Sequence, residues 1–405
     1  MRVAFLVNAF PKLSETFLLN QITGLVDVGH DVDIYAVQRT DEDVTHGQIA
    51  DYDLLDRTTY LTVEGVDWLR VAPPIAYRAL VDVGRDPSQL GRFLSHRRDA
   101  VRLTDAFRPV SSPLLDRLDG YDAVHAHFGP IGNGFRFLAD RTDAPFVVSF
   151  YGYDVKEALG KHPCRYGPLF DAADAVTVLS EDMREKLEDA GCPPAKTTKV
   201  PLCVDTSTFA FSERTTRTDD RIELVTVARL VEKKGLAYAI DAVAQLADEY
   251  DVRYRIAGDG TLRSELERRI RARGLDEQVE LLGWVEQGTV SDLLAAGDVF
   301  LLPSVTARSG DEEGTPTVLL EAQARGLPVV STYHSGIPEI VSDGRSGLLA
   351  PERDADALAR KLRTLFDHPE LWGEMGRNGR RYVEEVHSVG TVTERLERLY
   401  TSTKG

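Results

Sequence analysis

The sequence predicts an α/β protein made of two Rossmann-like domains, on three observations. Short apolar segments alternate with helical patterns along the chain, which is typical of parallel α/β domains. The alternation starts again at Ile222, after a polar stretch at 211–220 that has no periodicity. The 405 residues suffice for two domains, each with a core of its own. We therefore expect two parallel sheets that face an interdomain cleft, with a shared substrate between the domains, at the carboxyl ends of the strands.

The apolar segments and helical patterns place the elements in order. In the first half the expected strands are Val3–Val7, Asp33–Val37, Ala123–Ala126, Phe146–Phe150 and Ala175–Leu179, and the expected helices are Thr16–Val28, Tyr77–Val83, Leu90–Phe107 and Asp182–Ala190. In the second half the strands are Ile222–Val227, Tyr254–Ala257, Val279–Leu282, Val299–Leu302 and Pro328–Ser331, with helices near Ala237–Glu249 and Leu262–Arg273 and after Thr317 and Asp354. We expect domains at 1–205 and 221–385, a linker at 206–220, and a last helix at about 386–405 that packs back on the first domain.

The net charge of −17 argues against nucleic acid as a partner, since binding phosphate backbones needs a cationic face. Only ten of the 48 basic residues are Lys, and such an acidic, Lys-poor chain suggests a salt-rich cytoplasm like that of a halophile. The three cysteines lack metal or disulfide spacing, which favours reduced thiols. No signal peptide pattern or membrane-spanning run occurs, so we expect a cytoplasmic protein.

One basic segment departs from this acidic balance. Residues 68–108 contain eight Arg and four Asp, and Arg92, Arg97, Arg98 and Arg102 alternate with apolar residues as on an amphipathic helix. Such a helix fits peripheral contact with anionic lipid on the inner face of the membrane, or with a phosphorylated acceptor. A solvated helix face explains the same pattern.

The most informative segment is Glu313-Gly-Thr-Pro-Thr-Val-Leu-Leu-Glu321. Glu313 should lie on a loop before the Gly314/Pro316 break, because Pro316 fits the first turn of a helix. Glu321 lies eight positions later, inside that helix. The free N–H groups of the helix start stand between the two carboxylates and form an anion site. Sugar hydroxyls, diphosphate and ribose hydroxyls of a nucleotide-sugar have the matching order, which points to glycosyl transfer.

Together, several motifs make the chain resemble retaining family 4 glycosyltransferases of the GT-B fold, of the colanic-acid and exopolysaccharide type. The first half carries Phe10-Pro-Lys-Leu-Ser-Glu-Thr-Phe17, His125-Ala-His-Phe-Gly129, Phe150-Tyr-Gly-Tyr-Asp154 and Val200-Pro-Leu-Cys-Val-Asp205. The second half carries Val227-Ala-Arg-Leu-Val-Glu-Lys-Lys-Gly235, Ile256-Ala-Gly-Asp-Gly260, Leu282-Gly-Trp-Val285 and the Glu-x7-Glu segment. Single strings are weak, but their order and spacing are specific, and the resemblance covers nearly the whole chain.

The resemblance implies a donor site in the second domain. Arg229 and Lys234, with Lys234 preferred to Lys233, would stabilise the departing diphosphate, and no metal or other cofactor is expected. Glu313 would bind sugar hydroxyls and Glu321 the ribose hydroxyls. The N–H groups of Thr317 and Val318, after Gly314, would face the diphosphate. Trp284 or Val285 lies where the family holds the base, although an ordinary strand end fits that pair almost as well.

In the first domain the resemblance favours His127 as a contact of the donor sugar, with His125 more buried. Both lie on one face of a strand, two positions apart, but a metal would need a third ligand that the sequence does not offer. Tyr151 and Asp154 should line the acceptor side. A helix cap is an equal interpretation of Asp154, because a helix is expected to begin there.

The Ser14-Glu-Thr16 loop departs from the family, many of whose members have a Gly-Gly loop here. The hydroxyls of Ser14 and Thr16 could donate to phosphate, or Ser14 could be the N-cap of the following helix. Strings such as Asp31-Val-Asp33, Asp51-Tyr-Asp53 and Asp354-Ala-Asp356 imitate a metal motif of another transferase fold, and we expect no ligands there.

The resemblance therefore implies an enzyme that moves a hexose-type sugar, with retention, from a UDP- or GDP-linked donor to a glycan or lipid-linked acceptor in polysaccharide synthesis. The attacking hydroxyl would enter from the leaving-group face, since no side chain is placed as a covalent nucleophile. Two alternatives stay open. They are a nucleotide-sugar sensor of the same fold without turnover, and a nucleotide-sugar epimerase that needs no acceptor.

Overall fold

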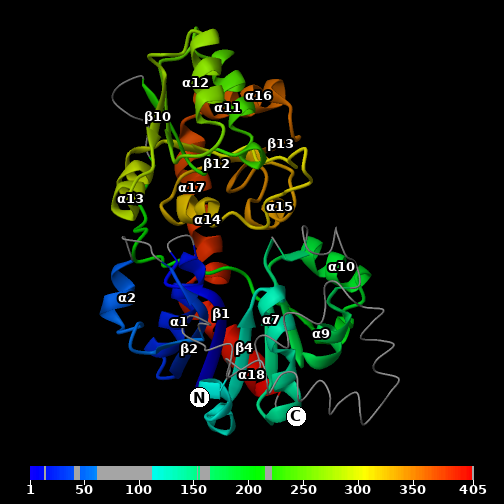
Figure 1. The fold of residues 1–405 in the computed structure, drawn as a ribbon. Coiled ribbons are helices and arrows are strands. Elements are labelled where there is room, and N and C mark those ends of the chain that lie inside the picture. Colours follow the sequence, from blue (N-terminus) through cyan, green and yellow to red (C-terminus); the bar gives the residue numbers. More distant parts are fainter. Residues whose placement is uncertain are drawn as a thin grey trace. The chain divides into compact units, whose positions relative to one another are not determined.

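The computed structural model of the protein describes residues 1–12, 15–40, 46–61, 112–152, 154–155, 165–214 and 221–403. The contacts divide the chain into two compact units (Figure 1). The first consists of Met1–Val178, Glu185–Lys199 and Arg395–Gly405, and the second of Leu179–Arg184 and Val200–Glu394. The domain boundaries expected at 205 and 221 stay a prediction. The expected helices Tyr77–Val83 and Leu90–Phe107, and the Arg-rich segment 68–108, lie outside the described residues.

The sheet of the first unit is parallel and has seven strands in the order β3-β2-β1-β4-β5-β6-β7. Its strands are β1 (Arg2–Phe10), β2 (Asp31–Arg39), β3 (Thr58–Tyr60), β4 (Ala123–His127), β5 (Phe146–Ser149), β6 (Ala175–Val178) and β7 (Thr197–Lys199). The central strands are buried along their length, which is why they read as nearly continuous apolar runs. The strand order reverses between β1 and β4, where such folds bind ligands.

The helices around this sheet are mostly short. They are α1 (Thr16–Asp27), α2 (Gly47–Asp51), α6 (Ser112–Leu115), α7 (Gly129–Phe135), α9 (Gly167–Ala172) and α10 (Glu181–Asp189), with 3₁₀ turns at Leu118–Gly120, Arg136–Arg141 and Pro194–Lys196. The end of the last helix, α18 (Val389–Ser402), belongs to this unit as well. Its Tyr400 hydroxyl lies 2.7 Å from Nδ1 of His125, which fixes the end of the chain to β4.

The sheet of the second unit has six parallel strands in the order β10-β9-β8-β11-β12-β13. They are β8 (Ile222–Val227), β9 (Val252–Ala257), β10 (Val279–Gly283), β11 (Val299–Leu301), β12 (Val329–Thr332) and β13 (Gly347–Ala350). Its helices are α11 (Leu236–Ala244), α12 (Arg263–Ala272), α13 (Gln287–Ala296), α14 (Thr317–Ala324), α15 (Ile337–Ile340), α16 (Ala355–Asp367) and α17 (Glu370–Tyr382), with a 3₁₀ turn at Glu232–Lys234 and a π turn at Val383–His387. The order reverses between β8 and β11, so the candidate ligand edge is where these two strands end.

The two parallel α/β sheets confirm the predicted fold class. Three edge or outer strands were missed, β3, β7 and β13. The first two read Thr-Thr-Tyr and Thr-Thr-Lys and are only partly buried, so they lack the apolar run that marks the central strands. The third, Gly-Leu-Leu-Ala, is short and begins with glycine. Within the described part of the chain, no helix is long and apolar enough to cross a membrane.

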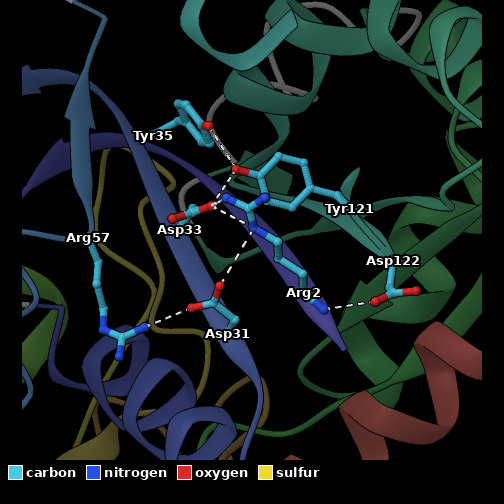
Figure 2. A network of polar contacts seen from close by, with 7 residues as sticks. All are labelled: Arg2, Asp31, Asp33, Tyr35, Arg57, Tyr121 and Asp122. Atoms are coloured by element: carbon cyan, nitrogen blue, oxygen red, sulfur yellow. Dashed lines mark hydrogen bonds and ion pairs between the residues drawn. The ribbon is translucent and has the colours of Figure 1, made fainter. Parts of the chain in front are cut away.

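A network of polar contacts fastens the amino ends of β1 and β2 (Figure 2). The guanidinium of Arg2 lies 2.6 Å from Asp33 and 3.6 Å from Asp31, and its carbon lies 4.8 Å from the centre of the Tyr121 ring. The hydroxyl of Tyr121 donates to Asp33, and Arg57 binds Asp31 at 3.1 Å. Both carboxylates of the Asp31-Val-Asp33 string are therefore held by cations and a hydroxyl at the edge opposite the strands' carboxyl ends.

Gly235 lets two connections of the second unit approach closely. It follows the Glu232–Lys234 turn with φ +65°, and a Cβ placed on it would lie 1.8 Å from the carbonyl oxygen of Pro303. Pro303 follows β11, so this contact sets the spacing between the β8–α11 turn and the β11–α14 loop. Only glycine satisfies both the backbone angle and the space.

We predict that Gly235→Ala lowers the free energy of unfolding by about 3 to 4 kcal/mol, because it adds backbone strain and a clash with a backbone oxygen. Gly274→Ala is the matched control. Gly274 has φ +69° but open space around its Cβ position, so only about 1 to 2 kcal/mol should be lost. Thermal unfolding of both variants measures the difference, and equal losses would contradict the close approach at Gly235.

Candidate functional site

The candidate site of the second unit lies where β8 and β11 end. Arg229, Lys233 and Lys234 follow β8, and Glu313 lies in the loop that leads from β11 to α14. The N–H of Val305 in that loop donates to the carbonyl of Lys233 at 2.8 Å. The two connections are thus bonded to each other at the point where the strand order reverses. This arrangement brings lysine side chains and a glutamate from distant parts of the sequence together.

Glu313 carries the central interaction of the site. Its Oε2 lies 2.6 Å from Nζ of Lys234 and its Oε1 lies 3.4 Å from Nζ of Lys233. Glu313 and Lys234 are each only 8% exposed. Burial alone would raise the pKa of the Glu313 carboxyl, but the two ammonium groups outweigh it and lower the pKa to about 2. The group is therefore a buried carboxylate shared by two cations.

Lys233 is a second cation beside Glu313, which the sequence did not indicate. We expected Lys234 alone to act, but Lys233 also approaches Glu313, and it binds Asp311 at 3.1 Å and the carbonyl of Glu312. The acidic run at 311–313 is consequently bonded to the turn after β8, although the side chain of Asp311 stays exposed. Arg229, in contrast, is exposed, and its guanidinium makes no ion pair with the part of the chain that the structure describes.

Helix α14 begins at Thr317, with Pro316 immediately before it, one position earlier than the first-turn place expected for the proline. The N–H groups of Thr317 and Val318 open the helix, where no preceding turn supplies acceptors. Glu321, the fifth residue, is half-buried, and its carboxyl group has no hydrogen-bond or ion-pair partner among residues with described positions. Burial raises its pKa to about 7. The segment thus offers two N–H groups that can donate hydrogen bonds, followed by the carboxyl group of Glu321, which no described side chain binds.

Gly314 and Val285 complete the residues predicted on the donor side. The carbonyl of Gly314 packs against Gly336, where a Cβ would lie 3.1 Å away. Val285 follows β10 and is partly buried, next to Trp284, which is 55% exposed. β10 is the edge strand, separated from β8 by β9. The predicted base contact at Trp284 or Val285 therefore lies two strands away from the Lys234–Glu313 pair and stays a prediction.

In the first unit, His125 and His127 lie side by side, as their alternation on β4 predicted, with ring centres 4.2 Å apart. Both are fully buried, and burial lowers the pKa of each below the usual value. His125 is bonded to Ser149 and to Tyr400, which marks it as structural. His127 meets the Tyr151 hydroxyl through Nδ1 at 2.9 Å, while its buried Nε2 has no hydrogen-bond partner in the described ranges. His127 thus keeps one nitrogen uncommitted.

Asp154 is fully buried, and its carboxylate accepts hydrogen bonds from the N–H groups of Tyr151 at 3.0 Å and Gly129 at 3.1 Å. Burial raises its pKa to about 7, although these bonds oppose the shift. Gly129 is the first residue of α7. Asp154 therefore binds the start of α7, not a helix that begins at Asp154 as the cap interpretation assumed. Its role toward an acceptor stays a prediction.

The loop before α1 bears on the N-cap, which was one of two alternatives for Ser14. The N-cap position of α1 is Glu15, and Ser14 lies outside the described residues. Glu15 is 8% exposed, and its carboxylate lies 2.6 Å from Nζ of Lys12. Thr16 is the partly buried first residue of the helix. A lysine–glutamate pair was not predicted at this loop, and the role of Ser14 and Thr16 toward phosphate stays a prediction.

Comparisons with known proteins add the family. Residues 208–382 match the family described as glycosyl transferases group 1, and residues 14–203 match a glycosyl transferase 4-like domain. A protein of Salmonella typhimurium that carries the name colanic acid biosynthesis glycosyltransferase WcaL is 37% identical over 383 residues, which is 92% of each chain. The chain belongs to the group 1 glycosyltransferases. The amylovoran biosynthesis glycosyltransferase AmsK of Erwinia amylovora is 35% identical over 89% of this glycosyltransferase and 90% of AmsK.

Solved structures agree on the fold. The Anabaena protein Alr3699/HepE in complex with UDP superposes with a TM-score of 0.72 over 99% of this glycosyltransferase and 100% of that chain, at 17% identity. The outer core galactosyltransferase WaaB superposes with a TM-score of 0.67 at 15% identity, over 99% and 100% of the two chains. Together with the two parallel sheets of this glycosyltransferase, these neighbours confirm the GT-B fold that the sequence predicted.

Acidic strings of the glycosyltransferase that imitate a metal motif are occupied by protein groups. Asp354 caps α16 by accepting from the N–H of Ala357 at 2.8 Å, as expected of a helix cap, and Asp356 accepts from Gln245. A search of the described ranges finds no cluster of three or more potential metal ligands. The expected absence of a metal cofactor remains a prediction, because a substrate could supply further ligands.

Sequence reasoning missed Lys233, His334 and Glu352 of the glycosyltransferase. His334 follows β12 and accepts the N–H of Glu313 through Nε2 at 3.1 Å, and Glu352 follows β13 and binds His334. The signal that could have revealed them is their position directly after a buried parallel strand, since polar residues at such positions lie together at the ligand edge of the sheet. His334 could have been found in this way, but Glu352 could not, because its strand was not predicted.

The Lys234–Glu313 pair should dominate the stability of this site. We predict that Lys234→Met costs about 2 to 4 kcal/mol at pH 7, because Glu313 stays buried with a single, more distant cation. The double variant Lys234→Met/Glu313→Gln should lose less than the single one. Since the folded-state pKa of Glu313 is lowered from 4.5 to about 2, its contribution is present above pH 4.5 and disappears as the pH falls toward 2.

Urea or thermal unfolding between pH 7 and pH 3 measures these differences. Lys361→Met is the matched control, because Lys361 pairs with Asp343 at 3.8 Å and both side chains are about one-third exposed. It should change stability by less than about 1 kcal/mol. If Lys234→Met and Lys361→Met had the same small effect, the buried pair would not stabilise the fold.

Proposed function

We propose that this chain is a retaining, metal-independent glycosyltransferase that moves a hexose-type sugar from a UDP- or GDP-linked donor to a glycan or lipid-linked glycan. The observation that carries the proposal is the order in which charged and hydrogen-bonding groups follow one another along one edge of the second unit. Two lysines and Glu313 are followed by the free N–H groups of α14 and by the unpartnered Glu321. Membership of the group 1 glycosyltransferases supports it.

The leaving group defines the first set of roles. When the glycosidic bond of the donor breaks, negative charge grows on the departing diphosphate. Arg229, Lys233 and Lys234 supply positive charge, and the N–H groups of Thr317 and Val318 supply hydrogen bonds, without rearrangement of solvent. This set of donors is sufficient to bind a diphosphate, so the proposal assigns no step to a metal ion.

The two glutamates define the ends of the donor. Glu321 has free acceptor capacity beside the helix start and fits the pair of ribose hydroxyls. Glu313 is ionised at neutral pH and accepts from the lysines, so it fits an acceptor for sugar hydroxyls that also orders the cations. Changes around Glu313 should therefore alter the choice of sugar, whereas changes at Glu321 should act on the nucleotide.

The proposed retention uses no covalent nucleophile of the protein. Glu313 is tied to two ammonium groups that lower its pKa to about 2, which makes it a poor nucleophile. In the proposed mechanism the acceptor hydroxyl attacks from the face that the diphosphate leaves, and its proton passes to the donor phosphate. His127, neutral and with an uncommitted Nε2, is proposed to contact the donor sugar, and Tyr151 and Asp154 the acceptor.

The relatives indicate the biological setting of the proposal. WcaL and AmsK are named for the biosynthesis of colanic acid and amylovoran, and the Anabaena neighbour was crystallised with UDP-glucose as well as UDP. We therefore infer a role in cell-surface polysaccharide or glycoconjugate synthesis, in the cytoplasm and at the inner face of the membrane, where lipid-linked acceptors are extended.

A panel of UDP- and GDP-sugars, with and without EDTA, tests the proposal. We expect nucleoside diphosphate to be released from one donor at a rate that EDTA does not change, and the anomeric configuration of the product to match that of the donor. Glu321→Ala should bind this donor about 10- to 100-fold more weakly, because hydrogen bonds to a charged group contribute about 1.5 to 3 kcal/mol. The variant Lys361→Met, away from the site, should behave as the parent.

Three outcomes would contradict the proposal. Binding of a donor without any release or transfer would favour a nucleotide-sugar sensor. Loss of activity with EDTA would refute the metal-independent mechanism. Formation of an epimer of the donor sugar, with no acceptor required, would favour an epimerase.

A further inference from the structure

A histidine and a glutamate from the two strands beyond β11 support the loop that carries Glu313. His334 follows β12, is 1% exposed, and accepts the N–H of Glu313 through Nε2 at 3.1 Å. On the other side of the ring, Nδ1 bonds Oε1 of Glu352, which follows β13. The strands β11, β12 and β13 are neighbours in the sheet, so all three residues lie at its carboxyl edge.

These contacts fix the tautomer of His334. A backbone N–H can only donate, so Nε2 must carry a lone pair and not a proton. The proton of the neutral ring is then on Nδ1 and is donated to Glu352. The carboxyl group of Glu352 is ionised at neutral pH, because the N–H of Thr306 and His334 outweigh the effect of burial and lower its pKa. Glu352 thus favours the tautomer of His334 whose Nε2 can accept the N–H of Glu313.

Glu352 holds the loop at both ends of the acidic turn. Its Oε2 accepts from the N–H of Thr306 at 2.9 Å, and through His334 it reaches the N–H of Glu313. Between these points the chain closes on itself, with Ala307 N–H bonded to the carbonyl of Asp311 at 2.7 Å. One carboxylate outside the loop thus bonds it at Thr306 and, through His334, at Glu313, in addition to the lysines that hold the loop from the β8 side.

The turn that presents His334 is itself tightly constrained. The N–H of His334 donates to the carbonyl of Thr332 at 2.8 Å, and its carbonyl accepts from Ile337 at 3.0 Å. Ser335, the next residue, has φ +45°, in the left-handed region that residues other than glycine rarely adopt. Strain of this kind persists where the surrounding structure requires it, and here it keeps the ring under the Glu313 loop.

We propose that His334, oriented by Glu352, is a positioning residue that sets the carboxylate of Glu313 against the donor sugar. The inference rests on the proposed transferase function and deepens it, since it names the residues that hold Glu313, the proposed acceptor for the sugar hydroxyls, in place. In the proposed function the nucleotide is bound by Glu321 and the start of α14, so the His334–Glu352 pair should govern how the sugar is held and transferred more than how the nucleoside diphosphate binds.

The variants His334→Phe and Glu352→Gln test this inference, with the donor that the parent protein uses. His334→Phe keeps the ring but removes both nitrogens. Thr306 and His334 bind different oxygens of Glu352, and Glu352→Gln replaces one of these oxygens with an NH₂ group that can only donate. If that NH₂ group faces Nδ1, the ring proton moves to Nε2. Both should lower kcat/KM by about tenfold or more, whereas the Kd of the free nucleoside diphosphate should change less than threefold.

His334→Gln provides the rescue, because its amide oxygen can accept the N–H of Glu313, and it should recover part of the activity lost in His334→Phe. His368→Phe is the matched control. His368 forms a similar pair with Glu370 at 3.0 Å, but both side chains are more than half exposed. Parent-like transfer by His334→Phe, or an equal loss of nucleoside diphosphate affinity, would overturn the positioning role.

The ring nitrogens can be observed without any assay of activity. Long-range ¹H–¹⁵N correlation spectra of the parent protein, assigned with His334→Gln, should show His334 protonated on Nδ1 at pH 7.5. A proton on Nε2 would overturn the inference even if the protein is a transferase. The predicted tautomer in a protein that turns over no donor would instead contradict the proposed function alone.

Discussion

The carboxylate of Glu313 is the constraint on which the candidate site depends. It is buried between Lys234 and Lys233, and each of these three groups would be unfavourable there alone. Because Glu313 balances part of their charge, the ammonium groups of Lys233 and Lys234 can lie together at the ligand edge of the sheet. A diphosphate would compete with Glu313 for the same ammonium groups, and a sugar would compete with them for Glu313. In the proposed function, donor binding is an exchange of partners within a preformed set of charges.

The parallel sheet makes this pairing possible. Lys234 and Glu313 are far apart in the sequence but follow β8 and β11, which are neighbours at the point where the strand order reverses. Gly235 allows the two connections to approach, and Val305 bonds them together. The next two strands supply His334 and Glu352, so four adjacent strand ends act on one loop. The chemistry of the edge follows from topology as much as from any motif.

The fold, and the placement of Glu313 before and Glu321 inside one helix, could be predicted from sequence because their signals are local. Buried central strands read as apolar runs, and Glu313 and Glu321 are separated by a recognisable helix start. Lys233 was passed over because two adjacent lysines cannot be ranked without the loop that approaches them from β11. Glu352 depended on β13, whose short Gly-Leu-Leu-Ala sequence gives little signal. The helix start at Thr16 was predicted correctly, and it leaves Glu15 in the position before α1, so the N-cap alternative at Ser14 did not follow from the predicted start.

The affinity of the two glutamate variants for the free nucleoside diphosphate tests the exchange of partners most directly. Calorimetry should be carried out with the diphosphate of the base that the donor panel identifies. Glu313→Gln releases Lys233 and Lys234 from their carboxylate, so it should bind the diphosphate more tightly than the parent, by about threefold or more. Glu321→Gln should bind it more weakly. A Glu313→Gln variant that bound the diphosphate as weakly as the parent, or more weakly, would contradict the account.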